Sequence, residues 1–291
     1  MSAAADAIDL GALREGERRG RVNWPLRIGV ILVGLVVVMA AVSFVWTPWD
    51  PYFVDGSNRL AGPSPSHWMG TDRFGRDILS RLMVGARTTL YVGVVAVGLA
   101  AAIGTPFGIV MGMAPRRLGT PLVRLNDLLL AFPALLLAIM FGAVFGASTT
   151  TAMIAIGLGT VPVFARIARS GTLQVMSTEY VLAARSAGRS APAIAVRHVL
   201  PNISSLLLVQ ASVSFAIAVL AEAALSFLGF GTQPPTPSWG FMLNDAYTVL
   251  QVMPLQSLWP GLAIAIAVLG FNLLGDGLRD RLDPRLAEHR S

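Results

Sequence analysis

The stretch Tyr180–Asn202, YVLAARSAGRSAPAIAVRHVLPN, lies between two long apolar segments and carries three arginines. Within it, Ala183-Ala184 is followed by Gly188, and Leu200-Pro201 comes twelve residues after that glycine. Glycine supplies the backbone angles that end one helix, and proline interrupts the next. The spacing therefore predicts a hairpin of two short helices that are joined at Gly188 and stopped at Pro201.

The composition around this stretch is that of a membrane protein. The 291 residues are 54% hydrophobic and 13% charged, with a mean hydropathy of +0.66. Soluble domains carry roughly 25% charged residues. The sequence pI of about 10.9 does not indicate nucleic-acid binding, because the arginines gather at the ends of apolar segments rather than on one soluble face.

The missing residue types exclude several kinds of chemistry. There is no cysteine, so disulfides and thiolate metal sites are excluded. There is no lysine, so the chain cannot form a phosphate-binding loop that ends in Gly-Lys-Ser/Thr. His67, His198 and His289 are too scattered to predict a metal site. We therefore expect no catalytic residue and no cofactor in this chain, and any ATP would bind another chain.

Six apolar stretches are long enough to cross a membrane, since a helix needs about 20 residues to span the hydrocarbon. They predict an all-α polytopic fold with six transmembrane helices, in which a first helix is followed by a core of five at 88–278. The predicted spans are 26–46, 88–113, 123–145, 149–168, 203–229 and 258–278.

The arginine distribution predicts the orientation of these spans in a cytoplasmic membrane. If the N-terminus lies inside, 17 of the 22 arginines fall on the cytoplasmic side and five on the outer side. Positive charge in short loops favours the cytoplasmic side. We therefore expect an N-terminal tail at 1–25 and a C-terminal tail at 279–291, both in the cytoplasm.

Three loops are then expected outside, of which the second is only the short turn at 146–148. The first, 47–87, begins with an irregular segment rich in Pro, Gly and Asp, and Asp72–Arg87 is predicted to form a helix near the outer surface. In the last outer loop, Ser238 is predicted to cap a short helix, Trp239–Val252, that Pro254 ends.

The opening stretch resembles the EAA loop of permease subunits in ABC importers, a pattern of Glu-Ala-Ala, three residues, Gly, nine residues and Ile-x-Leu-Pro. The Ala-Ala, Gly and Leu-Pro positions match, whereas Leu182 stands at the Glu position and His198 at the Ile position. In that family the loop docks on the ATPase subunit. The resemblance implies an ATPase-coupling loop at 179–201, with Glu179, Ala183, Ala184, Gly188, His198, Leu200 and Pro201 as its coupling residues.

Three further stretches narrow the resemblance to the C-type permeases of oligopeptide and dipeptide importers. They are Met69–Arg87 (MGTDRFGRDILSRLMVGAR), Glu222–Gly240 (EAALSFLGFGTQPPTPSWG) and Gly275–Arg285 (GDGLRDRLDPR). With the EAA-like loop, the likeness runs from about residue 24 to 286. Permeases for nickel, glutathione and other small solutes share these motifs, so these substrates stay open beside peptides.

The resemblance implies a type I importer fold and a set of partners. These are a second, B-type permease, two ATPase domains that hold ATP and Mg, on one chain or two, and an extracytoplasmic binding protein. Short peptides would be the substrate, and membrane lipid would surround the chain.

Other residues have a functional and a structural interpretation. Glu222 and Asn272 are polar within predicted spans, so they either face a translocation path or hydrogen-bond inside the bundle. Asp72 and Arg76 either meet the binding protein or form salt bridges in the outer loop. Trp239 either contacts the binding protein or anchors the membrane interface.

Two rival classes of function remain. A stand-alone secondary transporter would need ionisable groups along a membrane path, and only Glu222 qualifies. An intramembrane enzyme would need paired catalytic groups at membrane depth, and no such pair is evident in the sequence.

Overall fold

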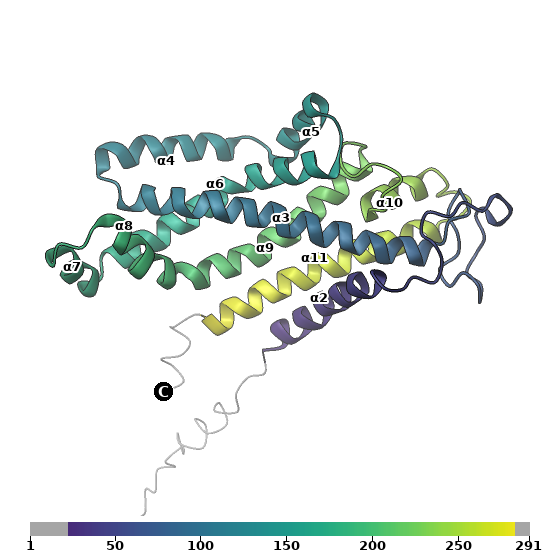
Figure 1. Ribbon diagram of the computed structural model, residues 1–291, viewed down its shortest axis with the longest axis horizontal. Helices are drawn as coiled ribbons and strands as arrows, with labels where there is room; N and C mark the ends of the chain where they lie inside the picture. The colour runs from purple at the N-terminus through teal and green to yellow at the C-terminus, as the bar shows by residue number, and fades with distance from the viewer. Residues whose placement is uncertain (1–22, 283–291) are drawn as a thin grey trace, which may run out of the picture.

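Long helices run side by side along the longest axis of the molecule in the computed structural model, which describes residues 23–282 (Figure 1). Five helices are long and apolar enough to cross a membrane, or six if a bent pair counts as one span. The long helices are α2 (Trp24–Ser43), α3 (Ile78–Met113), α6 (Thr149–Met176), α9 (Leu200–Phe227) and α11 (Leu255–Leu282), and the bent pair is α4 (Arg116–Ala131) with α5 (Ala134–Phe145). Shorter helices are α7 (Glu179–Ser186), α8 (Ala191–Ile194) and α10 (Trp239–Tyr247), with a 3₁₀ turn at Gly56–Asn58.

The surface helix predicted at Asp72–Arg87 does not exist as a separate element. Helix α3 begins at Ile78, where the Asp77 carboxylate accepts a hydrogen bond from the Ser80 backbone N–H at 2.7 Å, and continues without a break through Pro106. Its 36 residues give a length of about 54 Å, well beyond the ~30 Å of hydrocarbon. The predicted surface helix and the second span are thus one helix.

The third span is broken rather than straight. Helices α4 and α5 meet at an angle of 76°, and the break falls at Phe132-Pro133. Proline lacks a backbone N–H and forces the residue before it out of the helical region, and Phe132 is extended, with ψ of 126°. On α4, the buried Asn126 amide donates to the carbonyl of Pro162 at 3.2 Å, which ties this leg to α6.

The predicted start of the short helix at Trp239 is confirmed, but its predicted end at Val252 is wrong. The Ser238 hydroxyl accepts from the Phe241 backbone N–H at 3.2 Å, as expected of a helix cap. Helix α10 ends at Tyr247, five residues before the predicted Val252, and turns follow.

Helices α3 and α6 touch through small residues. Gly104, Gly108 and Gly112 recur every fourth residue on one face of α3. A Cβ at Gly104 would lie 2.5 Å from the Val161 carbonyl oxygen, and one at Gly108 would overlap with the carbonyl oxygen of Ala165. In lipid, helices associate by close backbone packing because no hydrophobic driving force remains between them. This contact is therefore a principal source of stability in the bundle.

We predict that Gly108→Val destabilises the protein by roughly 3 kcal/mol, because the side chain must push α3 away from α6. Gly98→Val is the matched control on the same helix, where a Cβ meets no atom within 4 Å. Thermal unfolding of the detergent-solubilised chain measures the difference. Equal melting temperatures for the two variants would contradict close packing at this interface.

Candidate functional sites at the two ends of the bundle

One end of the bundle carries an exposed helical hairpin formed by α7 and α8 (Figure 1). Helix α7 ends at Ser186, and Gly188 adopts φ of +76°, a left-handed angle that glycine accepts without strain. Helix α8 then starts at Ala191. The predicted pair of short helices joined at Gly188 is confirmed.

The predicted stop at Pro201 is wrong. A five-residue π-helical segment, Ala195–Val199, connects α8 to α9, and Pro201 lies in the first turn of α9. The backbone N–H of Leu200 reaches five residues back to Ala195. The wider turn accommodates a proline ring that would clash with a carbonyl of a regular α-helix. The second half of the hairpin is therefore continuous with a membrane span.

Buried apolar side chains fix the hairpin to the bundle. Val181 and Val199 have no exposed surface, and Ile194 has 1%. They pack in one cluster with residues of three long helices, so a displacement of the hairpin acts directly on those helices. The cluster partners are Ile109 of α3, Ala168 and Val175 of α6, and Ile203 of α9.

The outward surface of the hairpin carries most of the predicted coupling residues. Ala184 and His198 are partly buried, and the His198 ring lies 5.9 Å from the ring of Tyr180. The arginines at 185, 189 and 197 are exposed on the same segment. This exposed surface is therefore basic and carries small residues, and its contact with another chain stays a prediction. The exposed coupling residues are Glu179, Ala183, Gly188, Leu200 and Pro201.

The opposite end is held together by a buried ion-pair cluster. The Asp72 carboxylate accepts from Nε of Arg76 at 2.7 Å, and Nε of Arg81 lies 3.7 Å away. Arg76 also reaches Asp245 of α10 at 3.2 Å, and Arg73 contacts the same carboxylate at 2.7 Å. The cluster therefore links the loop between α2 and α3 to α3 and α10.

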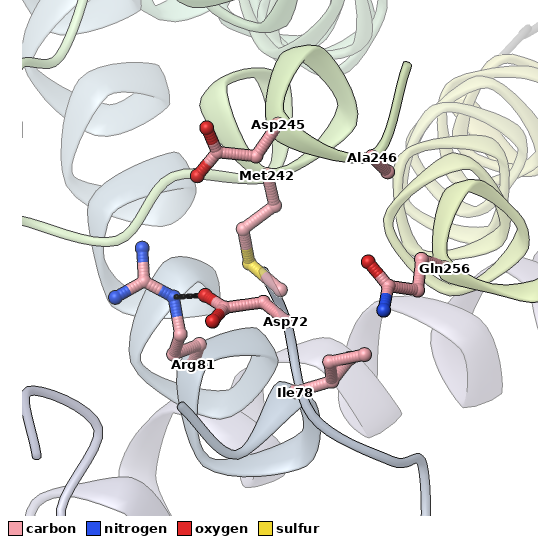
Figure 2. A pocket seen from close by; sticks show the side chains of 7 residues that line it. All are labelled: Asp72, Ile78, Arg81, Met242, Asp245, Ala246 and Gln256. Carbon is pink, nitrogen blue, oxygen red and sulfur yellow. Dashed lines mark ion pairs between the residues drawn. The ribbon is translucent and has the colours of Figure 1, made fainter. Parts of the chain in front are cut away.

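A cavity of about 20 Å³ lies inside this cluster. Figure 2 shows Asp72, Arg81 and Asp245 around it, with Gln256 of α11 on the opposite wall. The Gln256 amide donates to the carbonyl of Thr71 at 2.7 Å, so α11 is tied in as well. The volume is that of a single water molecule. The site is therefore too small for a peptide.

Burial and hydrogen bonds shift the pKa values of two carboxyl groups at this end in opposite directions. Burial raises the pKa of Asp245, and the guanidinium groups of Arg73 and Arg76 oppose that rise. Hydrogen bonds from the side chains of Ser57 and Asn58 lower the pKa of Asp55 in the exposed part of the loop. The cluster is therefore a costly charge assembly that the surrounding fold must hold in place.

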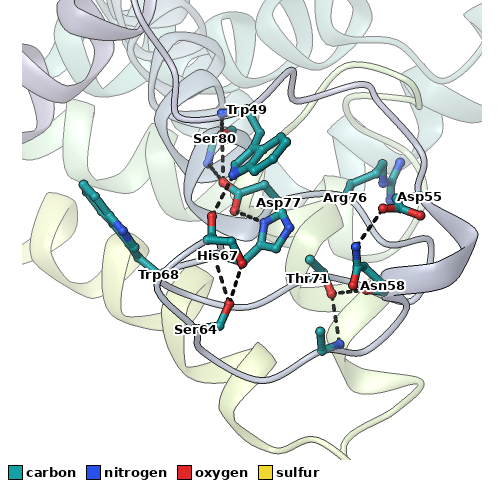
Figure 3. Close-up of polar contacts among 12 residues, drawn as sticks. Trp49, Asp55, Asn58, Ser64, His67, Trp68, Thr71, Arg76, Asp77 and Ser80 are labelled. Atoms are coloured by element: carbon teal, nitrogen blue, oxygen red, sulfur yellow. Dashed lines mark hydrogen bonds and ion pairs between the residues drawn. The ribbon is translucent and has the colours of Figure 1, made fainter.

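A second polar group at this end brings together a serine, a histidine and an aspartate that sequence reasoning did not associate (Figure 3). Nδ1 of His67 lies 2.9 Å from Asp77, and the Ser80 hydroxyl donates to the other oxygen of Asp77 at 2.7 Å. The carboxylate lies between the other two, so the histidine does not activate the serine as a nucleophile. The Trp49 backbone N–H donates to the Ser80 hydroxyl, and its ring stacks on His67 at 4.9 Å. The group anchors the loop, and the only signal for it in the sequence is the Asp-x-x-Ser start of a helix.

The residues expected to meet a binding protein are turned inward. Trp239 has no exposed surface, and its indole N–H donates to the carbonyl of Leu82 at 2.9 Å. Asp72 and Arg76 are each 8% exposed and belong to the ion-pair cluster. The structure therefore favours the salt-bridge interpretation of Asp72 and Arg76. Trp239 fits neither of its two interpretations, because a docking residue and an interface anchor must both be exposed.

The residues expected to line a translocation path have different positions. Glu222 is fully buried, and its carboxylate accepts from the hydroxyls of Ser226 at 2.6 Å and Thr232 at 3.2 Å. These bonds hold the loop after α9 against the helix. Asn272 is partly buried on α11. A role for either residue in the path stays a prediction.

We predict that Asp72→Asn loosens the outer loop by about 3 kcal/mol or more, because Arg76 and Arg81 then lose a buried counter-charge. Tryptic cleavage after the exposed Arg59 in detergent should become faster. Asp127→Asn is the control, because Asp127 pairs with Arg166 at 2.9 Å on an exposed surface and its loss costs less than about 1 kcal/mol. Equal cleavage rates for Asp72→Asn and the wild type would show that the cluster does not hold the loop.

Comparisons with known proteins agree with this geometry. Residues 104–288 match the family described as binding-protein-dependent transport system inner membrane component. The dipeptide transport system permease protein DppC of Alkalihalophilus pseudofirmus is 41% identical over 94% of this chain and 90% of its own length. The glutathione transport system permease protein GsiD of Escherichia coli is 42% identical over 92% and 89%.

A solved structure shares the fold at much lower sequence identity. An inward-facing structure of the MetNI methionine ABC transporter aligns with a TM-score of 0.56 and 17% identity, over 72% of this chain and 96% of the other. The resemblance to the type I importer permeases is thereby confirmed for the fold. The chain belongs to the family of binding-protein-dependent transport system inner membrane components, as a multi-pass permease subunit of an ABC importer and not an enzyme.

Proposed function

We propose that this chain pairs with a second, B-type permease and carries short peptides across the cytoplasmic membrane. A binding protein would deliver the peptide, and partner ATPases would hold ATP and Mg. The observation that carries the proposal is the exposed α7–α8 hairpin, clamped to α3, α6 and α9 by Val181, Ile194 and Val199. The buried base joins the exposed surface of the hairpin to three membrane-spanning helices, which is the arrangement that a coupling element requires.

In the proposed mechanism, the movement of the ATPases reaches the membrane helices through the base of the hairpin. When the ATPases close, the surface around Ala183 and Gly188 moves with them. Because α8 continues through Ala195–Val199 into α9, this movement tilts a membrane span rather than bending a flexible linker. The Val181 contact moves α6 and α3 at the same time. ATP binding drives the change only to the extent that it stabilises the outward-open state over the inward-open one.

A short peptide is the substrate that the relatives favour. One close relative is named for dipeptide and another for glutathione, which is itself a small peptide. Nickel and other small solutes remain alternatives within the family. Uptake of a labelled dipeptide by the assembled transporter in proteoliposomes, with unlabelled dipeptide, glutathione or Ni²⁺ as competitors, distinguishes them. No uptake of labelled dipeptide or glutathione, together with uptake of labelled Ni²⁺ by the same proteoliposomes, would end the peptide proposal.

We predict that Gly188→Val leaves assembly intact but lowers ATP-driven uptake at least about ten-fold, because a β-branched residue resists φ of +76° and reorients the hairpin. Gly188→Asn is the matched control, since asparagine tolerates this angle and a Cβ meets no atom within 4 Å. Uptake is measured in proteoliposomes with ATP supplied on the ATPase side. Wild-type uptake by Gly188→Val, or uptake that survives without partner ATPases, would contradict the proposal.

We also propose that the α7–α8 end lies in the cytoplasm and the ion-pair cluster outside. Because the natural chain has no cysteine, single substitutions report orientation directly. In intact cells, Ser57→Cys should react with a membrane-impermeant maleimide, whereas Ser186→Cys should react only after the membrane is opened. Both serines are exposed in the structure. The reverse pattern would invert the topology.

A further inference from the structure

A basic cavity of about 440 Å³ opens where the end of α3, the start of α4 and the end of α6 meet. Three arginines line it, Arg116, Arg124 and Arg169, and no acidic side chain does. Within residues 23–282 none of the three takes part in an ion pair. The remaining lining residues are Met111, Gly112, Ala114, Gly119, Thr120, Val123 and Leu173.

Two features of the cavity point to an anionic ligand. Nε of Arg169 is buried and has no hydrogen-bond partner among the described residues, so this lining arginine keeps a charge that no protein group there satisfies. Helix α4 also begins here, and its capping residue Pro115 provides no side-chain hydrogen bond. The free backbone N–H groups and the positive end of a 16-residue helix add to the arginine charge. Oxygens of a phosphate fit both kinds of donor.

The depth of the cavity matches one headgroup layer of the membrane. In the third turn of α3, Nε of Arg87 donates to the Ser43 hydroxyl at 2.5 Å, and its guanidinium lies 4.0 Å from the ring of Phe44. These residues end α2 next to the exposed Trp46, which marks a membrane interface. From Arg87 to Gly112 the helix rises about 38 Å. A bilayer is about 30 Å thick in its hydrocarbon and 40–45 Å with headgroups. Gly112 therefore lies in the opposite headgroup layer.

Part of the cavity lining is apolar. Leu173 is exposed there, and Met111 and Val123 belong to the wall; these three residues are called the apolar rim. An acidic protein segment would present charge without a need for this rim, whereas a phospholipid presents a phosphate that continues into acyl chains. Charge, depth and rim together favour a lipid over a protein partner.

We propose that this cavity binds the phosphate of an anionic phospholipid from the cytoplasmic leaflet. Arg116, Arg124 and Arg169 would hold the phosphate. The proposal rests on the proposed orientation, which places this end of α3 in the cytoplasm. A bound lipid would fix the start of α4 beside α6, next to the hairpin that α6 helps to anchor.

The first test is native mass spectrometry of the purified full-length chain with dioleoyl-phosphatidylglycerol or dioleoyl-phosphatidylcholine. We expect one tightly held phosphatidylglycerol, and binding weakened roughly ten-fold or more in the triple variant Arg116→Gln, Arg124→Gln, Arg169→Gln. The matched control removes the same charge from exposed arginines at the same end: Arg27→Gln, Arg279→Gln, Arg281→Gln. Equal losses in both triple variants would overturn the proposal, because they would show general attraction without a site.

The second test locates the bound lipid and does not require the triple variant to fold. Thr120→Cys places a single thiol in the cavity lining. Its reaction with a water-soluble maleimide should be at least about five-fold slower in phosphatidylglycerol nanodiscs than in phosphatidylcholine nanodiscs, by the same electrostatic attraction. Inorganic phosphate with phosphatidylcholine nanodiscs should give no such protection; equal protection there would assign the site to free phosphate.

A protein occupant gives a different result. Protection that appears only in the assembled transporter, whatever the lipid, would assign the cavity to a partner chain and overturn the lipid proposal. Neither test involves ATP or peptide, so a failure of lipid binding leaves the proposed transport function untouched. Reversed labelling of Ser57→Cys and Ser186→Cys would instead remove the orientation on which the choice of leaflet rests.

Discussion

Close contact between the backbones of α3 and α6 is the constraint on which the other features depend. Gly104, Gly108 and Gly112 let α3 lie directly on α6 in a solvent where apolar side chains gain nothing by leaving lipid for protein. The same contact places Ile109 of α3 beside Val175 of α6, and these residues form the floor on which the hairpin sits. A larger residue in the glycine row would therefore disturb both the span packing and the base of the hairpin.

Proline has three different effects in this chain, and tertiary packing decides among them. Pro106 lies inside an unbroken α3, and Pro162 inside an unbroken α6. Pro133 breaks the third span by 76°, whereas Pro201 follows a π-helical turn and the helix continues. The ring has the same local effect each time, the loss of one donor and a clash with a carbonyl. At Pro106 and Pro162 the packing of neighbouring helices keeps the helix axis in one direction. At Pro201 the wider π-helical turn before it accommodates the ring.

Features that depend on residues close together in the chain could be predicted from the sequence, and contacts between distant residues could not. Apolar length located the spans, and local chemistry located the turn at Gly188 and the cap at Ser238, because each depends on residues close in the chain. The start of this helix at Ile78 rather than Asp72 was missed, since Asp77 caps a helix only if the loop before it folds back. The ion pair of Arg76 with Asp245 joins positions 169 residues apart, and several other partners were equally plausible from charge alone. The burial of Trp239 was missed because its partner, the carbonyl of Leu82, is also far away in the chain.

The length of α3 connects the two ends physically. Its first turns carry Arg81 of the ion-pair cluster, and its last turns carry Ile109 of the hairpin base. Because α3 is one continuous helix, a tilt driven through the hairpin is passed along it to the place where α3 meets α10. The buried charges there are held by specific distances rather than by non-directional apolar contact, so they resist gradual sliding. In the proposed mechanism, the outer end of the subunit therefore moves as one body with α3, and opening occurs between subunits rather than within this chain.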